Sequence, residues 1–203
     1  MEDTIVAPAT PLGKGGVSVV RVSGVGAKAV GEVVCGELNR PWVFKKCQIK
    51  NKKGVVVDSG LVVLFESPKS YTGEDVVEVH CHGSPVVVDL VVESFLSAGC
   101  RLAEPGEFTK RAYLNEKIDM TQAEAVSDLI ASETEEAARA AHNSLVGEFS
   151  KLVNGVIDRV VSVRVLVESS IDFSDEDGVV FDKEARSSLI PSIQKEVDSL
   201  EFL

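Results

Sequence analysis

The stretch DVVEVHCHGSPVVVDLVVESFLSAG, residues 75–99, contains the pattern that decides the fold. Its first part, Asp75–His82, largely alternates apolar and polar side chains, which is typical of a strand with one buried face. Ser84 and Pro85 follow as residues that favour the N-cap and the first position of a helix, and Gly99 favours a helix end. The stretch therefore predicts a strand followed by a helix.

Strand-like and helix-like segments continue to alternate up to about residue 118. The Asp58-Ser59-Gly60 sequence separates two apolar runs and so predicts a hairpin turn. A hairpin requires antiparallel neighbours, so a mixed sheet is expected in this α/β domain rather than a purely parallel one. The other predicted elements are strands at Val17–Val22, Val55–Val57, Leu61–Glu66 and Arg101–Ala103, and helices at Ser23–Cys35, with Gly36 as its cap, and Pro105–Asn115.

Charge and periodicity both change near residue 120. Residues 1–120 contain 14 Lys/Arg and 15 Asp/Glu, whereas residues 121–203 contain 7 and 17. Beyond this break the apolar spacing is helical only, with a capping box at Thr121–Glu124 and a third helix from about Lys183. We therefore expect an α+β chain, with a domain at 1–118 and a helical segment at 119–203. One long apolar helix face is expected from Leu145, Phe149, Leu152, Val156, Val160, Val163 and Val167.

Several common site patterns are absent from the 203 residues. The sequence contains no GxxxxGK[ST] phosphate-binding loop, no GxSxG elbow and no CxxC…CxxC pattern. No stretch reaches the roughly 20 apolar residues of a membrane span. The cysteines lack the spacing of a disulfide framework, so we expect reduced thiols in the cytoplasm. They are Cys35, Cys47, Cys81 and Cys100.

Alternate side chains of the strand predicted at Asp75–His82 share a face. Two histidines and one glutamate on one face are zinc-ligand types. They are spread along about 13 Å of strand and cannot readily converge on one ion, so we expect no metal. The apolar side chains should face the core and the polar ones an open surface; the first are Val77, Val79 and Cys81, and the second are Glu78, His80 and His82.

Three further features have alternative interpretations. Arg21 lies among apolar neighbours in the strand Val17–Val22 and needs either an acidic partner or an open cleft. The glycine loop 13–16 precedes a strand and lacks a helix dipole, which favours a turn over a phosphate cradle. A basic cluster is either a solvated hairpin or a phosphate-binding patch; it consists of Lys45, Lys46, Lys50, Lys52 and Lys53.

Linked strings along the chain match one pattern in order and spacing. They are Asp3–Ala7, Ala9–Pro11, Gly15–Val17, Arg21–Gly24, Tyr71–Glu78, His82–Gly83, Pro105–Thr109, Arg111–Asn115, Lys117–Asp119, Gln122–Ala125, Asp128–Ile130 and Ile171–Phe173. Over essentially all 203 residues they resemble bacterial tRNA-modification GTPases of the MnmE/TrmE family. The departures are Lys14 for Arg, Tyr113 for Phe, Met120 for Leu and an unusual His80-Cys81 pair.

The resemblance implies an N-terminal domain like the folate-binding domains of aminomethyltransferases, which binds a tetrahydrofolate derivative and forms a homodimer. Residues 119–203 would be the first part of a helical domain, interrupted before a GTP-binding domain that would bring GTP, Mg and K. With a flavin-dependent partner, MnmG/GidA, such a protein modifies carbon 5 of the wobble uridine, U34, of certain tRNAs. The acidic chain itself is a poor nucleic-acid surface.

By motif match, the resemblance implies that Arg21, Glu78 and Lys117 contact folate, and it implies no catalytic residue in this chain. A carboxylate such as Glu78 accepts the donor edge of a pterin, and a cation suits the carboxylates of the folate tail. The ligand would be 5-formyl- or 5,10-methylene-tetrahydrofolate. Two other functions stay open: a free-standing folate-dependent one-carbon transferase and a purely structural oligomerisation module.

Overall fold

A computed structural model describes residues 3–172 together with 191, 194, 195 and 198. The chain divides into two compact units, Met1–Ile118 and Asp119–Leu203. The first unit contains a sheet and helices, and the second is helical where it is described. The expected α+β class, an N-terminal α/β domain followed by a helical region, is confirmed.

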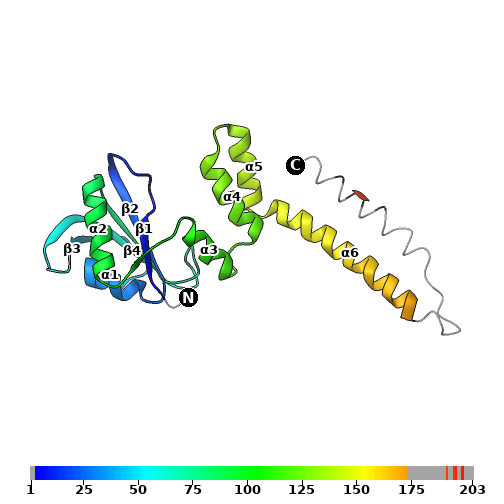
Figure 1. Ribbon diagram of the computed structural model, residues 1–203, viewed down its shortest axis with the longest axis horizontal. Coiled ribbons are helices and arrows are strands. Elements are labelled where there is room, and N and C mark those ends of the chain that lie inside the picture. Colours follow the sequence, from blue (N-terminus) through cyan, green and yellow to red (C-terminus); the bar gives the residue numbers. More distant parts are fainter. Residues whose placement is uncertain (1–2, 173–190, 192–193, 196–197, 199–203) are drawn as a thin grey trace. The chain divides into compact units, whose positions relative to one another are not determined.

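Six strands of the described residues form one mixed sheet in the first unit (Figure 1). Their order is β3-β4-β5-β2-β1-β6, in which β1 and β6 are parallel and all other neighbours are antiparallel. The strands are β1 Ile5–Pro8, β2 Gly15–Ser23, β3 Lys45–Lys50, β4 Val56–Phe65, β5 Val76–Gly83 and β6 Arg101–Leu102. The edge strand β3 and its turn contain the lysine cluster, so this cluster lies on a hairpin.

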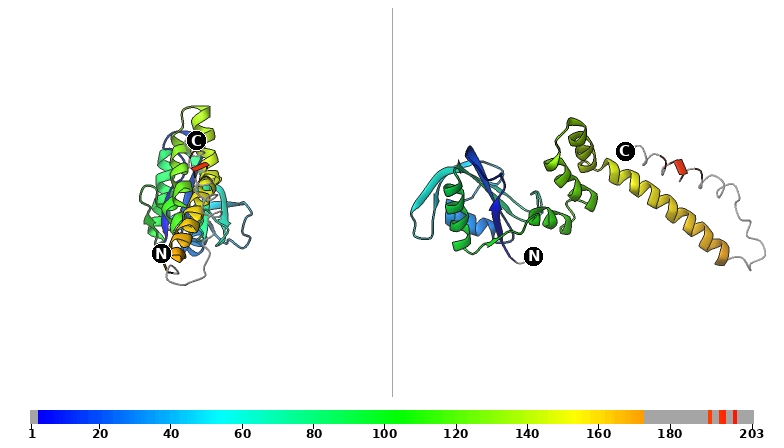
Figure 2. Two further views of the ribbon diagram at one scale, coloured as in Figure 1. Left: turned by 90° about the vertical axis from the view of Figure 1, so that its right-hand side faces the viewer. Right: turned by 45° about the horizontal axis from the view of Figure 1, so that its top comes forward.

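Two helices, α1 Ala27–Cys35 and α2 Pro85–Ser97, pack together against the sheet (Figures 1 and 2). The core beneath them is mainly aliphatic, and it also contains four cysteines and Phe95, which is fully buried. The third helix, α3 Glu107–Leu114, follows β6. Because both large helices use one face of the sheet, part of the opposite face is left for polar side chains.

The alternation predicted for β5 is confirmed. Its apolar side chains are 0–3% exposed and belong to the core, whereas its polar ones are half-buried or exposed. The helix after it begins at Pro85 as predicted, although the Ser84 side chain makes no capping hydrogen bond. Gly36 ends α1 with a φ of 81°. However, α1 begins at Ala27 rather than Ser23, because β2 extends through Ser23 to pair with β1 and β5.

The hairpin turn predicted at Asp58-Ser59-Gly60 was wrong. These residues lie inside β4, and the turn falls at residues 51–55 between β3 and β4. A Cβ on Gly60 would lie 2.1 Å from the carbonyl oxygen of His80. Gly60 therefore permits a close approach between two strands, which is the other common role of a glycine inside a strand.

We expect Gly60→Ala to destabilise the first unit by at least about 2 kcal/mol, because the added methyl group must push β4 away from β5. Urea unfolding followed by the fluorescence of Trp42, the single tryptophan, measures this loss. The matched control is Gly16→Ala, where an added Cβ meets nothing within 4 Å. Equal stability of the two variants would contradict the close-approach explanation.

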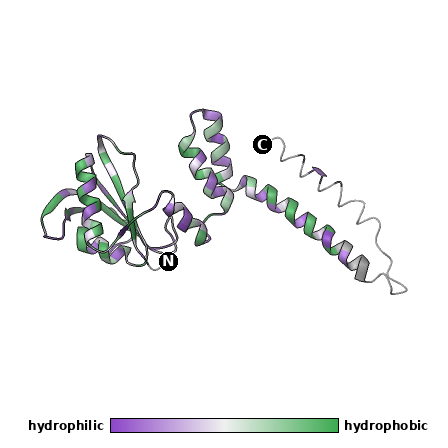
Figure 3. Ribbon diagram, in the orientation of Figure 1, coloured by the Kyte–Doolittle hydropathy of each residue, from purple (hydrophilic) through white to green (hydrophobic). Residues whose placement is uncertain are grey.

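The second unit contains α4 Met120–Ala131, α5 Glu135–Leu145 and α6 Glu148–Asp172. The capping box begins two residues earlier than predicted, since Asp119 and Gln122 exchange side-chain-to-backbone hydrogen bonds. The prediction of one continuous apolar helix face beginning at Leu145 was also wrong at its start. Leu145 is the last residue of α5, and Gly147, with a φ of 84°, separates α5 from α6. Along α6, hydrophobic and hydrophilic stretches succeed one another (Figure 3).

Of the third helix that we expect from Lys183, the structure describes only residues 191, 194, 195 and 198, so this helix stays a prediction. Within the part of the chain that the structure describes, no helix combines the length and apolarity needed to cross a membrane. Several large apolar side chains of α6 are about half exposed; they are Ile157, Val160, Val161 and Val165.

Candidate functional site

The face of the sheet away from α1 and α2 has a polar centre formed by two neighbouring strands. Arg21 on β2 lies directly opposite Glu78 on β5, and Glu78 lies opposite Val63 on β4. In the next row of this face, His80 lies between Val19 and Leu61. Cross-strand neighbours of this kind are close enough for their side chains to interact directly.

Arg21 and Glu78 form a tight ion pair. The Nε atom of Arg21 donates to Oε1 of Glu78 at 2.8 Å, and its Nη2 atom lies 2.7 Å from the same oxygen. The side chains are 25% and 17% exposed, so the pair is partly shielded but open to a ligand. The prediction that Arg21 has either an acidic partner or an open cleft is confirmed, because the partner is Glu78, itself a predicted site residue.

Aromatic rings surround this ion pair. The guanidinium carbon of Arg21 lies 5.1 Å from the ring centre of Tyr71 and 5.6 Å from that of Phe108, distances that suit cation–π attraction. The hydroxyl of Tyr71 hydrogen-bonds with Thr109 at 2.8 Å, which ties the loop before β5 to α3. The surroundings of the Arg21 guanidinium are thus formed by two rings that are distant from Arg21 in sequence.

The two histidines of β5 have different surroundings. His82 is 70% exposed, its backbone N–H donates to Asp58 at 2.8 Å, and its Nδ1 lies 2.7 Å from the same carboxylate. Burial raises the pKa of Asp58, but the hydrogen bonds from His82 outweigh this and hold the pKa below its usual value. His80 packs edge-on against Phe44, with ring centres 5.0 Å apart. Among the described residues, no group of three His, Cys, Asp or Glu side chains has the geometry to hold a metal ion.

Lys117 lies apart from the ion pair. Its Nζ donates to the carbonyl oxygen of Pro68 at 3.0 Å, and its aliphatic stem packs beside Gly73. It has no acidic partner within the residues that the structure describes. The same loop contains Tyr71, so the structure connects Lys117 to Arg21 and Glu78 through this loop and not by direct contact.

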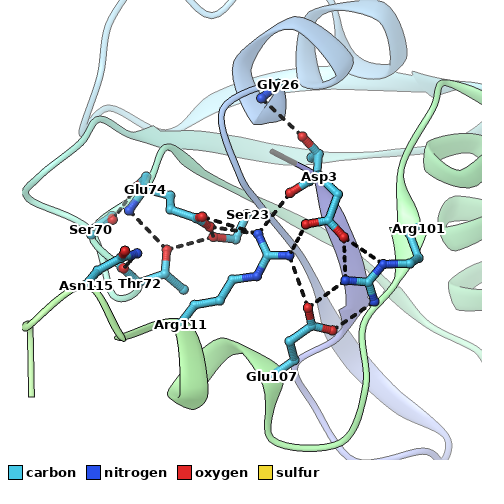
Figure 4. A network of polar contacts seen from close by, with 12 residues as sticks. Asp3, Ser23, Gly26, Ser70, Thr72, Glu74, Arg101, Glu107, Arg111 and Asn115 are labelled. Carbon is cyan, nitrogen blue, oxygen red and sulfur yellow. Dashed lines mark hydrogen bonds and ion pairs between the residues drawn. The ribbon is translucent and has the colours of Figure 1, made fainter. Parts of the chain in front are cut away.

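A buried charge network fixes the segments that border the site (Figure 4). The side chain of Arg111 on α3 is fully buried and donates to Asp3 at 2.8 Å, to Glu74 at 3.1 Å and to Glu107 at 3.1 Å. Arg101 donates to Asp3 and Glu107 from the other side. The network joins the start of β1, the loop 66–75 and α3, and the last two contain Tyr71 and Phe108.

The charges of this network shift one another's pKa values. Hydrogen bonds from Arg101, assisted by Arg111, lower the pKa of Glu107 to about 2, and they lower the pKa of Asp3 as well. Hydrogen bonds to Glu107 and Asp3 raise the pKa of Arg101. Burial lowers the pKa of Arg111, but its hydrogen bonds to Glu74 and Glu107 more than restore it. Asp3, Glu107, Arg101 and Arg111 therefore stay charged at neutral pH.

We expect the first unit to lose stability as the pH falls from about 4.5 towards 2. The pKa of Glu107 is lower in the folded chain than in the unfolded one, so its contribution is full above the unfolded value and disappears as the folded carboxyl takes up a proton. The urea midpoint of Trp42 fluorescence at about pH 5 and pH 3 measures this. Glu107→Gln should show a shallower pH dependence, and an unchanged slope would contradict the assignment.

Sequence reasoning missed the aromatic lining and the network. Asp3, Glu74, Glu107 and Arg111 all lie in the strings that gave the family resemblance, yet nothing local distinguishes them from ligand-binding charges. Arg111 follows Glu107 by four residues, a spacing that favours an ion pair on a helix, and the structure contains this pair. Tyr71 and Phe108 are 37 positions apart, and no local pattern joins them.

The fold and this site define a class of protein. It has a mixed-sheet α+β unit with an ion-paired carboxylate and aromatic rings on one sheet face, followed by a helical unit. Residues 4–117 match the family described as the GTP-binding protein TrmE N-terminus, and residues 120–201 match the MnmE helical domain. The chain therefore belongs to the MnmE/TrmE family, which confirms the resemblance.

The relatives are curated proteins named tRNA modification GTPase MnmE. The chain is 46% identical over 199 residues to that of Methylococcus capsulatus, covering 98% of the chain and 44% of the relative. It is 44% identical over 189 residues to that of Francisella tularensis subsp. novicida, with 93% and 42% covered. It is 47% identical over 174 residues to that of Neisseria meningitidis serogroup C, with 86% and 39% covered. The chain thus spans less than half the length of these relatives.

Proposed function

We propose that this chain binds a tetrahydrofolate derivative, 5-formyl- or 5,10-methylene-tetrahydrofolate, on the open face of its sheet. The observation that carries the proposal is the carboxylate of Glu78. Arg21 holds its Oε1 atom, while Oε2 has no hydrogen bond within the described structure and lies 3.9 Å from Nε2 of His80. The carboxylate is partly shielded, and the aromatic rings of Tyr71 and Phe108 lie beside its partner Arg21. A pterin offers flat aromatic surface and a row of N–H donors, which such a group accepts well.

The three predicted site residues take different roles in this proposal. Arg21 orients Glu78, because its guanidinium is already engaged by the carboxylate and two rings. Glu78 accepts the donor edge of the pterin. Lys117 is the cation for the carboxylates of the folate tail, because it is exposed and has no acidic partner among the described side chains.

The proposal extends to the longer protein to which the chain would belong. The relatives are named as tRNA modification GTPases, and the chain contains no GxxxxGK[ST] loop, so GTP, Mg and K would bind outside these 203 residues. Folate would supply a one-carbon unit for carbon 5 of the wobble uridine, U34, in the cytoplasm, together with the flavoprotein MnmG/GidA. A net charge of −11 favours tRNA binding by the full complex over binding by this chain.

A homodimer through the first unit is also part of the proposal. Three successive large apolar side chains, Trp42, Val43 and Phe44, are each 51–52% exposed before β3. Exposed apolar groups that are clustered in this way favour a protein interface over a solvated surface. The two alternatives, a free-standing one-carbon transferase and a purely structural module, have less support, because both family models belong to MnmE/TrmE and the three relatives described above are named tRNA modification GTPases.

Calorimetry and thermal unfolding with 5-formyl-tetrahydrofolate test the proposal on the 203-residue chain. A ligand that binds only the native state raises the melting temperature, and above Kd the rise grows with the logarithm of the ligand concentration. We expect saturable binding with a rise of the melting temperature, and a dimer in sedimentation. If the chain is a dimer but its melting temperature does not change with folate, the result would instead support the structural module.

A further inference from the structure

His80 is a polar residue of the open sheet face that the proposed function has not used. It lies on β5 two residues after Glu78, on the same face, between Val19 and Leu61 of the neighbouring strands. Its ring is held edge-on against Phe44, with ring centres 5.0 Å apart. The packing fixes the ring without giving its nitrogen atoms a partner on these strands.

The Nε2 atom of His80 is buried and makes no hydrogen bond in the structure. Native proteins pair nearly all buried polar atoms, and an exception at a site indicates a missing ligand or water molecule. The nearest charged atom is Oε2 of Glu78 at 3.9 Å, which is too far for a hydrogen bond. The unpaired Nε2 of His80 and Oε2 of Glu78, which makes no hydrogen bond within the described structure, therefore lie 3.9 Å apart.

We propose that His80 is a specificity-determining residue that donates from Nε2 to a ring carbonyl of the ligand while the adjacent Oε2 of Glu78 accepts from the neighbouring ring N–H. The inference rests on the proposed function and refines which edge of the ligand is recognised. A pyrimidinone edge presents an N–H group directly beside a C=O group, so it needs an acceptor and a donor that are close neighbours. The 3.9 Å separation meets this requirement.

In this arrangement the pterin is bound by Glu78 and His80 together, and not by the carboxylate of Glu78 alone. Oε1 of Glu78 already accepts a hydrogen bond from Nε of Arg21 and lies 2.7 Å from its Nη2, so Oε2 is the more available oxygen for a ligand. A hydrogen-bond donor beside Oε2 would bind a ring carbonyl but not the amino group that replaces it in the amino-substituted analogue, so it allows the site to distinguish the two ligands. His82 cannot take the same part, because its Nδ1 is engaged by Asp58 and its ring is exposed.

The test compares two ligands by calorimetry: 5-formyl-tetrahydrofolate and its 4-amino analogue, in which an amino group replaces the ring carbonyl. We expect the wild-type chain to prefer the carbonyl form. His80→Ala should lose about tenfold in affinity for the carbonyl form and much less for the 4-amino form, so the preference shrinks. His80→Gln, whose side-chain amide also offers an N–H donor, should recover most of the lost affinity.

His82→Ala is the matched control, since it removes a histidine from the same strand and face and should leave both affinities unchanged. Trp42 fluorescence verifies that each variant is folded. Equal losses for both ligands in His80→Ala, or no loss, would overturn the assignment of His80 while wild-type folate binding stands. A wild-type chain that binds neither ligand would overturn the proposed function together with it.

Discussion

Arg111→Met is expected to lower the free energy of unfolding of the first unit by about 3–5 kcal/mol, a large share of the stability of a small domain. The side chain of Arg111 is 0% exposed, and three carboxylates surround it. Removal of this buried cation takes away the one guanidinium that contacts both Glu74 and Glu107, so the two carboxylates lose a shared charge partner. Glu107 keeps Arg101 as a partner. Glu74 keeps only the neutral Ser23 hydroxyl as a side-chain donor among the described residues. Burying such unpaired charges is among the few single changes with effects of this size.

Urea unfolding followed by Trp42 fluorescence reports on the first unit selectively, because the single tryptophan lies there. Lys28→Met is the control: Lys28 and Glu66 are 3.7 Å apart and nearly half exposed, so this substitution should cost less than about 0.5 kcal/mol. Arg111→Lys should lie between the two, because it keeps the charge but not the forked donors. A loss below about 1 kcal/mol for Arg111→Met would show that the network contributes little to stability.

Periodicity predicts those parts of the fold whose neighbours are close in sequence. The alternation after Asp75 predicts both the strand β5 and its buried face, because a period of two requires nothing from the rest of the chain. The same alternation exists at Lys45–Lys50, where Cys47 and Ile49 are buried and alternate with polar residues. The lysines of this segment led to the prediction of a basic cluster and not of a strand.

Where the sequence does not predict the bounds of a strand or helix, contacts with residues distant in sequence determine them. Ser23 belongs to β2 because its backbone pairs with Val76 and its hydroxyl bonds with Thr72 and Glu74, about 50 residues away. Gly60 suits a turn by composition but serves a close contact with His80. In both cases local preference is overridden by a partner that only the folded sheet provides.

In the candidate site, too, some features follow from the local sequence pattern and others require long-range contacts. Glu78 and His80 follow from the strand pattern alone, whereas the pairing of Glu78 with Arg21 requires the register between β2 and β5. The aromatic lining requires α3 and the loop before β5 to be held beside the sheet, which is the work of the Arg111 network. The charged strings thus serve two purposes, since Asp3, Glu74, Glu107 and Arg111 hold the scaffold and Arg21 and Glu78 face the open surface.

Glu78→Gln is expected to weaken the binding of 5-formyl-tetrahydrofolate by about 30-fold, or roughly 2 kcal/mol, with the fold preserved. Glutamine has nearly the same shape, but its amide offers one neutral acceptor in place of two charged oxygens and weakens the hold of Arg21 on the side chain. Calorimetry measures the loss, and circular dichroism verifies the fold. Glu93→Gln is the control: Glu93 is exposed on α2, which packs against the opposite face of the sheet.

A double-mutant cycle with Arg21→Met separates the two roles that we assign to the pair. If Arg21 acts by orienting Glu78, Arg21→Met alone weakens binding, but it adds little once Glu78 has been replaced by Gln. If Arg21 contacts the ligand independently, the two losses add, and the orienting role is wrong. Wild-type affinity in Glu78→Gln, to within about twofold, would remove Glu78 from the site altogether, because the oxygen on which the proposed folate contact depends would then contribute nothing.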